Sequence, residues 1–314
     1  MDLKITQLPE KWIKQGYKIV EKVGEGAFGT VYKIKNQNKI SALKVVEYNN
    51  LSRFAQDLYD GNVDEAIIAY EKQFELEANR EIEFLKQFIG IENIVQYRDS
   101  YIEKDVEKHI FKYYIEMEYL IKLSDYIKQH KRFDLKQVLL FGIHACDALS
   151  AVHSKGMIHR DIKPSNFMVS TSKKYRVYKL VDFGVAKEKF DGLGTIIGTN
   201  DYMAPEVFNT QQYDKRADIY SLGLVLYYLM NNNRPASWQI SDVYERQEKR
   251  FEEGLPYISK SDKFERCEKN TNVNKWIMKI IRKATKENPE ERYLSAEDMR
   301  KDLMSCFCAN YKKK

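Results

Sequence analysis

The sequence has few of the residues that characterise disulfide-bonded, disordered or membrane proteins. Its four cysteines, Cys146, Cys267, Cys306 and Cys308, are too few and too scattered for a disulfide framework, and they lack the spacing of a zinc site. Only 6 of 314 residues are proline and 14 are glycine, while 43% are hydrophobic, which argues against long disordered stretches. We therefore expect a folded protein with reduced thiols that works in the cytoplasm.

The sequence also lacks a long apolar run. The N-terminal stretch MDLKITQLPEKW has no apolar core of signal-peptide length, and SLGLVLYYLM at 221–230 is shorter than the roughly 18–20 apolar residues that span a bilayer. We expect no membrane span in this chain. The terminal YKKK fits a solvated tail, or the start of a basic segment before a membrane anchor in a longer parent protein.

The chain also lacks a large excess of charge of one sign. The chain has 52 Lys and Arg against 46 Asp and Glu, a net charge of +6, and the two signs alternate in stretches such as EKHIFK and YERQEKRFEEG. There is no basic stripe with interleaved aromatics, the pattern typical of nucleic-acid binding. The sequence predicts a mixed-sign solvated surface and no nucleic-acid partner.

Hydrophobic periodicity divides the chain into a strand-rich front and a helical back. Alternating apolar residues predict three strands within 17–48 and a further strand pair in NIVQYRDSYIE and HIFKYYIEMEY. Between them a helix is predicted from about Asn62 to Phe88, by an apolar stripe at steps of three and four: Ile67, Tyr70, Phe74, Ala78, Ile82 and Leu85.

Beyond Leu120 the pattern is mostly helical, with apolar-periodic segments at 135–154, 214–231 and 273–286. We therefore predict an N-terminal lobe over 1–117, a hinge over 118–122 and a C-terminal lobe over 123–314.

One glycine-rich stretch, GEGAFGTVYK at 24–33, fits G-x-G-x-x-G at Gly24, Gly26 and Gly29. The pattern alone does not separate a phosphate-binding loop from an ordinary hairpin turn. Strands are predicted on both sides of it, which disfavours a dinucleotide-binding loop, because that loop opens a helix.

Five further segments follow in a fixed order: Lys44 in SALKVV, Glu81 in NREIEFL, HRDIKPSN at 159–166, DFG at 182–184 and APE at 204–206. Together with the glycine stretch they resemble the signature set of the protein kinase family. The resemblance covers about residues 17–305. It implies an α+β, bilobal protein kinase fold: a small antiparallel β-sheet lobe with one regulatory helix, and a larger, mainly helical lobe.

The resemblance also implies a catalytic set for phosphoryl transfer, in which catalysis rests on positioning and charge neutralisation. Lys44 would hold the ATP phosphates, fixed by an ion pair with Glu81 on a mobile helix. Asp161 would accept the proton of the substrate hydroxyl, with Lys163 neutralising the γ-phosphoryl group. Asp182 would bind one Mg²⁺ that bridges the phosphates and Asn166 a second Mg²⁺, because hard oxygen ligands suit that ion.

Two of these assignments have alternatives within the sequence. A lone strand lysine is usually solvated, but Lys44 lies between Leu43 and Val45, where an ammonium needs a partner. Glu83 is the rival to Glu81 as that partner, on another side of the helix.

The ATP site implied by the resemblance places the glycine hairpin over the phosphates and the adenine between apolar side chains, with the backbone of Glu118 and Leu120 on the purine edge. Met117 would control access to the back of this pocket. The expected ATP-binding residues are Val23, Gly24, Glu25, Gly26, Ala27, Phe28, Gly29, Val31, Ala42, Lys44, Met117, Glu118, Leu120 and Met168.

Other matched residues have structural roles in the family. His159, Leu85 and Phe183 match positions of a buried hydrophobic spine, with Tyr97 as a further member. Asp218 resembles the buried carboxylate that supports the catalytic loop. Glu206 is expected to form a buried ion pair with Arg292.

Substrate class and control are also implied. Lys163 and the sequence GTNDYMAPE, with Thr199, favour Ser and Thr over Tyr as acceptors, so the expected partners are ATP and Ser/Thr-containing proteins. Arg160 precedes Asp161, and kinases with this arginine are commonly activated by phosphate on the activation loop. Thr195 matches the usual phosphosite, so autophosphorylation at Thr195 is predicted.

Two segments depart from the family pattern: the long stretch between Lys44 and Glu81, which could add a helical turn or docking surface, and residues 234–269. IYSLGLVLYYLMNNNRP is most similar to bacterial members, many of which precede a membrane anchor. Two other functions remain: a pseudokinase, although Lys44, Asp161 and Asp182 are present, and a small-molecule phosphotransferase, which normally lacks a segment ending in APE.

Overall fold

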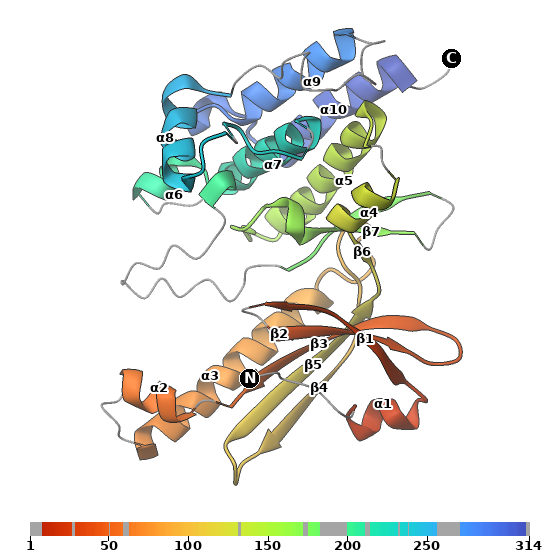
Figure 1. The fold of residues 1–314 in the computed structure, drawn as a ribbon, viewed down its shortest axis with the longest axis vertical. Coiled ribbons are helices and arrows are strands. Elements are labelled where there is room, and N and C mark those ends of the chain that lie inside the picture. Colours follow the sequence, from red (N-terminus) through yellow and green to blue (C-terminus); the bar gives the residue numbers. More distant parts are fainter. Residues whose placement is uncertain are drawn as a thin grey trace. The chain divides into compact units, whose positions relative to one another are not determined.

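A computed structural model provides the structure, and it describes residues 8–26, 29–49, 51–58, 63–130, 133–171, 175–182, 200–210, 214–231, 233–237, 239–255 and 271–311. The chain divides into two compact units, Met1–Ile91 with Val95–Leu120, and Glu92–Ile94 with Ile121–Lys314 (Figure 1). Residues 92–94 join the second unit because Asn93 O accepts a hydrogen bond of 2.9 Å from Leu180 N. The predicted lobe boundaries and hinge stay a prediction.

The first unit is built on one antiparallel sheet with the strand order β1-β2-β3-β5-β4. Its strands and helices are α1 (Glu10–Lys14), β1 (Lys18–Gly26), β2 (Gly29–Lys35), β3 (Ile40–Tyr48), α2 (Leu51–Leu58), α3 (Val63–Lys86), β4 (Tyr97–Asp105) and β5 (Ile110–Glu118). The three strands predicted within 17–48, the helix predicted at 62–88 and the later strand pair are confirmed. Helices α1 and α2 were not predicted as elements, because each is too short to show a period of its own.

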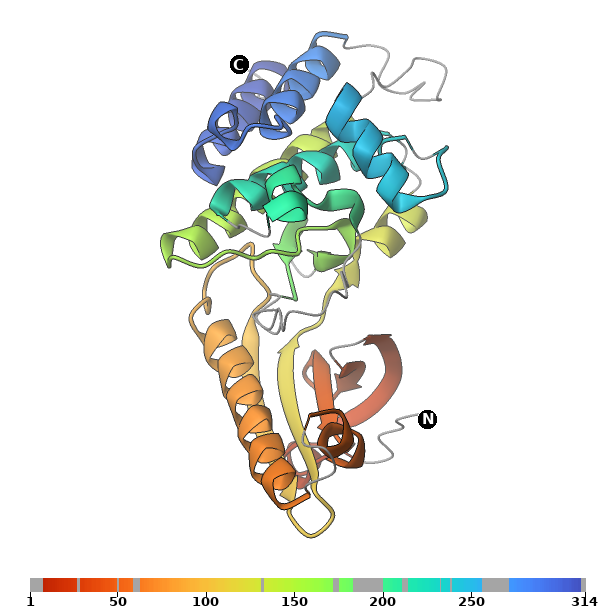
Figure 2. The same ribbon diagram turned by 90° about the vertical axis from the view of Figure 1, so that its left-hand side faces the viewer.

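Helices cover both faces of this sheet (Figures 1 and 2). Successive side chains of β5 point to opposite faces. The rings of Phe111 and Tyr113 contact Phe74 of α3, whereas the ring of Tyr114 contacts Trp12 of α1. Trp12 is fully buried and belongs to an apolar cluster with strand residues of β1, β2, β3 and β5. Residues before the matched region therefore form part of the core.

The second unit is mainly helical, with a small antiparallel sheet of order β6-β7-β8. Its helices and strands are β6 (Ile121–Lys122), α4 (Leu123–His130), α5 (Leu135–Ser154), η1 (Pro164–Asn166), β7 (Phe167–Ser170), β8 (Val177–Leu180), η3 (Asn200–Tyr202), α6 (Pro205–Thr210), α7 (Lys215–Met230), α8 (Val243–Glu253), α9 (Thr271–Ala284), η4 (Pro289–Glu291) and α10 (Ala296–Tyr311). The segments predicted at 135–154, 214–231 and 273–286 are confirmed as α5, α7 and α9.

Helix α5 lies at the centre of this unit. Asp134 caps its N-terminus by accepting a hydrogen bond from Gln137 N, and the Gln137 side chain accepts one from Asp134 N, which makes a capping box. Among the described helices, α5 is long and apolar enough to cross a membrane, but 61% of the apolar window is buried inside the fold. That burial is typical of a core helix. Helix α7 approaches α9 closely at Gly223, where a Cβ would lie 2.7 Å from Thr285 Cγ2.

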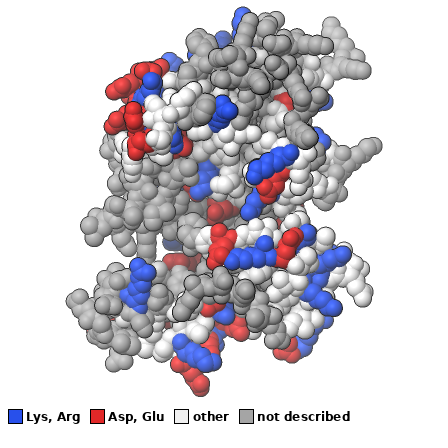
Figure 3. Space-filling model, in the orientation of Figure 1, with Lys and Arg blue, Asp and Glu red and all other residues white. Residues whose placement is uncertain are grey.

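Charged side chains of both signs are interspersed on the face shown in Figure 3. Several charged residues in the described part of the chain pair with a residue three positions away, such as Lys86 with Glu83 and Lys108 with Asp105. Exposed pairs of this kind contribute little to stability, usually about 0–1 kcal/mol. The described residues of this face therefore have the mixed-sign surface that the sequence predicts.

Candidate active site

The first unit holds Lys44 against helix α3. Lys44 lies on β3, opposite Val31 of β2 and Ile115 of β5, and its side chain is 12% exposed. Its Nζ donates to Glu81 Oε1 in an ion pair between the strand and the helix. The rival carboxylate, Glu83, pairs instead with Lys86 on the same helix at 2.7 Å.

The other oxygen of Glu81 accepts a hydrogen bond that the sequence analysis missed. The hydroxyl of Tyr113, on β5, donates to Glu81 Oε2 at 2.9 Å. Burial raises the pKa of Tyr113, as does the neighbouring Glu81 carboxylate, so the phenol stays protonated and remains a donor. In the sequence KYYIEME this tyrosine reads only as a strand residue, and nothing indicates which face it occupies.

The expected ATP-binding residues of the first unit that the structure describes lie on strands β1, β2, β3 and β5, or directly after β5. Val23, Gly24, Glu25 and Gly26 lie on β1, Gly29 and Val31 on β2, and Ala42 and Lys44 on β3. Val31 pairs with Lys44, and Ala42 pairs with Met117 of β5, so the side chains of these four residues share one sheet face. Ala27 and Phe28 lie outside the described residues.

Gly29 is the glycine with the clearest backbone requirement. Its φ is 109°, and a Cβ there would lie 2.4 Å from Val45 O. A larger residue would push β2 away from β3 at this position. Gly29 is also the residue at which the β1–β2 hairpin closes, because it pairs with Gly26. The strand geometry therefore requires a glycine at position 29, independently of any role of this stretch in phosphate binding.

The backbone around residue 118 limits how a base could bind. Glu118 N donates to Gln96 O at 3.0 Å, so this N–H group is already committed within the first unit. Leu120 is buried. Met168, the expected contact from the C-terminal part of the chain, lies on β7 of the second unit and is half-buried.

In the second unit the catalytic-loop residues form a compact cluster. Lys163 Nζ lies 2.9 Å from Asp161 Oδ2. The amide Nδ2 of Asn166 donates to Asp161 O at 2.8 Å and to Asp161 Oδ2 at 3.1 Å. The carboxylate of Asp161 is thus held between an ammonium group and an amide.

Asp218 supports this loop from helix α7. It is 1% exposed, and its two oxygens accept hydrogen bonds of 2.9 Å from the backbone N–H groups of His159 and Arg160. The Nε2 atom of His153 lies 2.8 Å from Asp218 Oδ2. Arg160 has a φ of 67°, a left-handed conformation that these bonds help to fix.

His159 is also buried, and its Nδ1 accepts a hydrogen bond of 3.3 Å from Asp161 N. Burial lowers the pKa of His159, which keeps the imidazole neutral. The ring therefore positions Asp161 through its backbone and packs in the core, the structural role expected of it.

Asn166 and Asp182 offer oxygen ligands of the kind that Mg²⁺ prefers. Because Nδ2 of Asn166 donates to Asp161, the amide oxygen is the atom of that side chain that could bind a cation. Asp182 is exposed, with a φ of 55°, and follows Val181, whose N–H donates to Asn166 O at 2.9 Å. This donor set fits Mg²⁺. Phe183, Thr195 and Thr199 lie outside the described residues.

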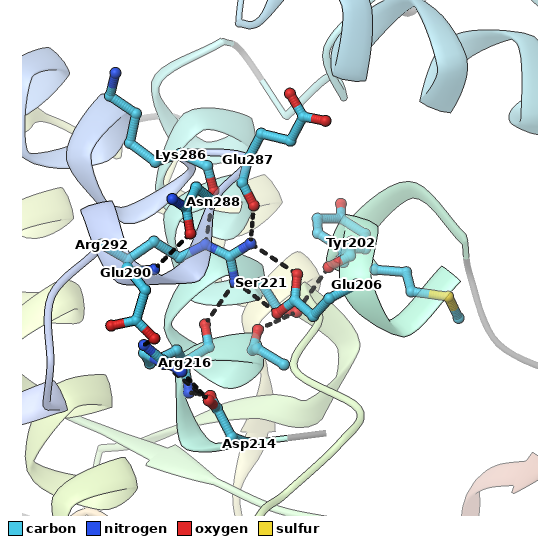
Figure 4. Close-up of polar contacts among 12 residues, drawn as sticks. Tyr202, Glu206, Asp214, Arg216, Ser221, Lys286, Glu287, Asn288, Glu290 and Arg292 are labelled. Atoms are coloured by element: carbon cyan, nitrogen blue, oxygen red, sulfur yellow. Dashed lines mark hydrogen bonds and ion pairs between the residues drawn. The ribbon is translucent and has the colours of Figure 1, made fainter. Parts of the chain in front are cut away.

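Glu206 and Arg292 form a bidentate ion pair, with both N–O distances 2.7 Å (Figure 4). The guanidinium also donates to the carbonyl oxygens of Lys286 and Glu287, and its side chain has no exposed surface. These contacts join α6 to the loop before η4.

Helix α8 supplies a second anchor, which the sequence analysis noted only as a departure at 234–269. Arg246 donates to both carboxylate oxygens of Asp201, at 3.0 and 3.1 Å. The buried Arg250 donates to Asp201 O at 2.7 Å and to Met203 O at 3.3 Å. Two arginines of α8 therefore fix residues 201–203, directly before APE.

Comparison with known proteins agrees with this geometry. The family model described as "Protein kinase domain" matches residues 17–304. The chain is 31% identical to "Serine/threonine-protein kinase PknB" of Mycobacterium tuberculosis over 201 residues, which is 61% of this chain and 30% of that protein. It is 27% identical to "Probable serine/threonine-protein kinase CPE1738" of Clostridium perfringens, over 91% of this chain and 38% of that protein.

A human relative is also similar: "Serine/threonine-protein kinase Nek10" is 30% identical over 242 residues, 73% of this chain and 19% of that protein. The chain spans about 30% of the length of the PknB proteins that it matches.

Proposed function

The chain belongs to the protein kinase family, and from this premise we propose that it transfers the γ-phosphoryl group of ATP to serine and threonine hydroxyls of proteins. The arrangement around Asp161 carries this proposal. Its carboxylate is an acceptor for a hydroxyl proton, and the ammonium group of Lys163 lies 2.9 Å away to neutralise a phosphoryl oxygen. Asn166 holds the Asp161 carboxylate and Asp218 holds the backbone just before it, so little reorganisation of Asp161 is needed for the reaction.

ATP and Mg²⁺ are the cofactors that this reaction requires. Lys44 would bind the α and β phosphates, kept in position by Glu81. Asn166 and Asp182 would hold Mg²⁺, which when bound neutralises negative charge on the phosphate oxygens. The other expected ATP contacts include Val31, Ala42, Met117 and the backbone of Glu118 and Leu120.

Two observations favour Ser and Thr over Tyr as acceptors. The relatives named above are serine/threonine-protein kinases by name, and Lys163 lies beside Asp161 as in that class. The three described cysteines, Cys146, Cys306 and Cys308, are free thiols, which supports a cytoplasmic location.

Control by phosphate is part of the proposal. Arg160 precedes Asp161 directly, and a phosphate adds about −2 charge that an arginine can bind. We propose Thr195 as the autophosphorylation site. After incubation with Mg-ATP, mass spectrometry should find phosphate on Thr195, and an active preparation with unmodified Thr195 would refute this point.

The central test is transfer of labelled phosphate from Mg-ATP to a mixture of dephosphorylated proteins, followed by phosphoamino acid analysis. Phosphoserine and phosphothreonine are expected, and Asp161→Asn and Asp182→Ala should each lower the rate at least about 10²-fold. ATP binding without transfer would identify a pseudokinase. Transfer only to small hydroxyl compounds would identify a small-molecule phosphotransferase, and either result would contradict the proposal.

A further inference from the structure

Helix α3 is tied to the sheet by a row of carboxylates. Lys104 of β4 pairs with Glu71 at 2.8 Å and also with Glu75. Further along the helix, Tyr48 at the end of β3 donates to Glu77, and Lys44 and Tyr113 both donate to Glu81. Strands β3, β4 and β5 thus each hold at least one carboxylate of the helix. The last carboxylate along the helix in this row, Glu81, is the partner of Lys44.

Glu81 differs from the other carboxylates of this row because strand residues hold both of its oxygens, whereas one oxygen of Glu77 is held by Gln73 of the same helix. Oε1 accepts from Lys44, and Oε2 accepts from Tyr113 at 2.9 Å. The terminal torsion of a glutamate is broad, so a carboxylate held by one oxygen can rotate, whereas one held by both is fixed. The lysine alone is a poor anchor, since its ammonium group sits on a flexible four-carbon chain.

We propose that Tyr113 is a positioning residue for phosphoryl transfer, whose hydroxyl fixes the orientation of Glu81 and thereby the position of the Lys44 ammonium group. This inference rests on the function proposed above. Helix α3 is then held in its ion-paired position by the first unit itself, through Tyr113 and, one turn earlier, Tyr48. The mobile helix expected from the resemblance is restrained here by two tyrosine hydroxyls.

Three properties suit Tyr113 to this role. Its side chain is buried, so water competes little for Glu81 Oε2. Its phenol stays protonated and donates throughout the physiological range. Its ring packs against Phe74 of the same helix, with centroids 6.0 Å apart, so the hydroxyl cannot swing away without disturbing the core.

The neighbouring residue provides a matched control. Tyr114 is equally buried on the same strand, and its hydroxyl also donates to a carboxylate, Glu103 Oε2, at 2.7 Å. It lies on the opposite face of the sheet, towards Trp12 and away from α3. Tyr113→Phe and Tyr114→Phe therefore remove the same kind of bond from the same strand, and only the first changes Glu81.

The test compares steady-state kinetics of both variants with the parent chain. Tyr113→Phe should lower kcat about tenfold and change the KM for ATP by less than about threefold, because Lys44 keeps its charge but loses alignment in the transition state. Tyr114→Phe should lower kcat less than about twofold, with a similar fall in melting temperature for the two variants. Equal kcat values for the two variants would overturn the inference.

A second background separates positioning from a general structural effect. If Tyr113 acts only through Glu81, then Tyr113→Phe added to Glu81→Gln should change kcat by less than about twofold, whereas another tenfold loss would contradict the inference.

Crystal structures of the two tyrosine variants give a readout that does not depend on turnover. The Glu81 carboxylate should be displaced from Lys44 only in Tyr113→Phe, and an unmoved Glu81 would refute the positioning role. A parent chain that transfers no phosphate would refute the proposed function. The crystal structures would still show whether Tyr113 fixes the orientation of Glu81.

Discussion

Two ion pairs, one in each unit, join segments far apart in the sequence; their carboxylates are similarly exposed, at 24% for Glu81 and 20% for Glu206, but the pairs differ in hydrogen-bond geometry and in the burial of the basic partner. Lys44 and Glu81 are separated by 37 residues, keep 12% and 24% of their side-chain surface exposed, and share one hydrogen bond. Glu206 and Arg292 are separated by 86 residues, share two parallel bonds of 2.7 Å, and leave the arginine side chain without exposed surface.

The difference indicates what each pair is for. The Arg292 guanidinium also donates to backbone carbonyls and stacks over the Tyr220 ring at 4.7 Å, so its donors are committed to the fold. The Lys44 ammonium group has three donors, and the pair with Glu81 uses one of them. A partly exposed ammonium with unused donor capacity can bind a phosphate; a dry guanidinium with all its partners in the chain can only stabilise.

The largest effect is expected for Arg292→Ala. Removing one partner of a buried ion pair leaves the other charge uncompensated, which typically costs about 3–5 kcal/mol of unfolding free energy. Urea unfolding monitored by circular dichroism measures this loss. The variant should lose activity because part of it is unfolded. The activity per folded molecule should therefore fall much less than the total activity.

The matched control is Arg216→Ala. Arg216 pairs with Asp214 and Glu290 at 2.6 Å, but Glu290 is largely exposed. Its loss should cost about 1 kcal/mol or less. If both substitutions destabilise equally, burial is not what separates these pairs.

Lys44→Met should produce the opposite result. The pair with Glu81 is partly exposed, so its loss should change the unfolding free energy by about 1 kcal/mol or less. The rate of phosphoryl transfer should fall about 10²–10³-fold, the usual cost of removing one group that stabilises transition-state charge. Steady-state kinetics at saturating ATP checks the rate, and urea unfolding checks the stability. A stability loss as large as that of Arg292→Ala would erase the contrast between the pairs.

The sequence was sufficient for the longer strands and helices and for both ion pairs, but not for the short helices α1 and α2 or for what surrounds the pairs. Alternation and helical periodicity located β1–β5, α3, α5, α7 and α9, and the motifs brought Lys44 to Glu81 and Glu206 to Arg292. Tyr113 was missed because KYYIEME has strand character at every position, and only the register with β3 and the placement of α3 decide which tyrosine meets Glu81.

The remaining gaps have similar causes. Arg246 and Arg250 lie in ERQEKRFEE, whose alternating charges are typical of a solvated face. Trp12 precedes the matched region, and nothing in EKWIK shows that the ring enters the core. Long-range partners of this kind depend on tertiary packing, which local patterns do not contain.

Substitution of Glu116 tests whether a buried carboxylate contributes to the stability of the fold. It lies on β5, is 2% exposed, and accepts hydrogen bonds from Trp12 and Tyr17 at 3.0 Å, from Ser41 at 2.7 Å and from Lys39 at 3.0 Å. Burial opposes its ionisation, but these four donors outweigh burial and lower the pKa of Glu116 from its ordinary 4.5. Glu116→Gln should cost about 1–3 kcal/mol of unfolding free energy at pH 7.

The pH dependence gives the sign of this effect. Because the folded pKa lies below 4.5, the unfolded chain binds more protons in the window beneath that value, so stability from Glu116 is complete above pH 4.5 and is lost as pH falls through the folded pKa. Urea unfolding from pH 7 to pH 3 should show the parent chain and Glu116→Gln converging. A difference that stays constant with pH would contradict an ionised Glu116.

A small effect on stability is expected for Arg246→Ala, which tests whether Arg246 stabilises the fold or fixes residues 201–203 directly before APE. Arg246 and Asp201 are 11% and 12% exposed, so their pair is less exposed than that of Lys44 and Glu81, while its arginine is more exposed than Arg292. Arg250 still holds the backbone of Asp201 and Met203, so the unfolding free energy should fall by about 1 kcal/mol or less. The loop directly before APE loses one of its two arginines, so the KM for a protein substrate should rise several-fold while the KM for ATP is unchanged.

Lys249→Ala, which removes an exposed pair from the same helix, is the control and should change neither value. An equal rise in both KM values would mean that α8 acts on the whole active site, and no rise in either would mean that residues 201–203 do not position the protein substrate.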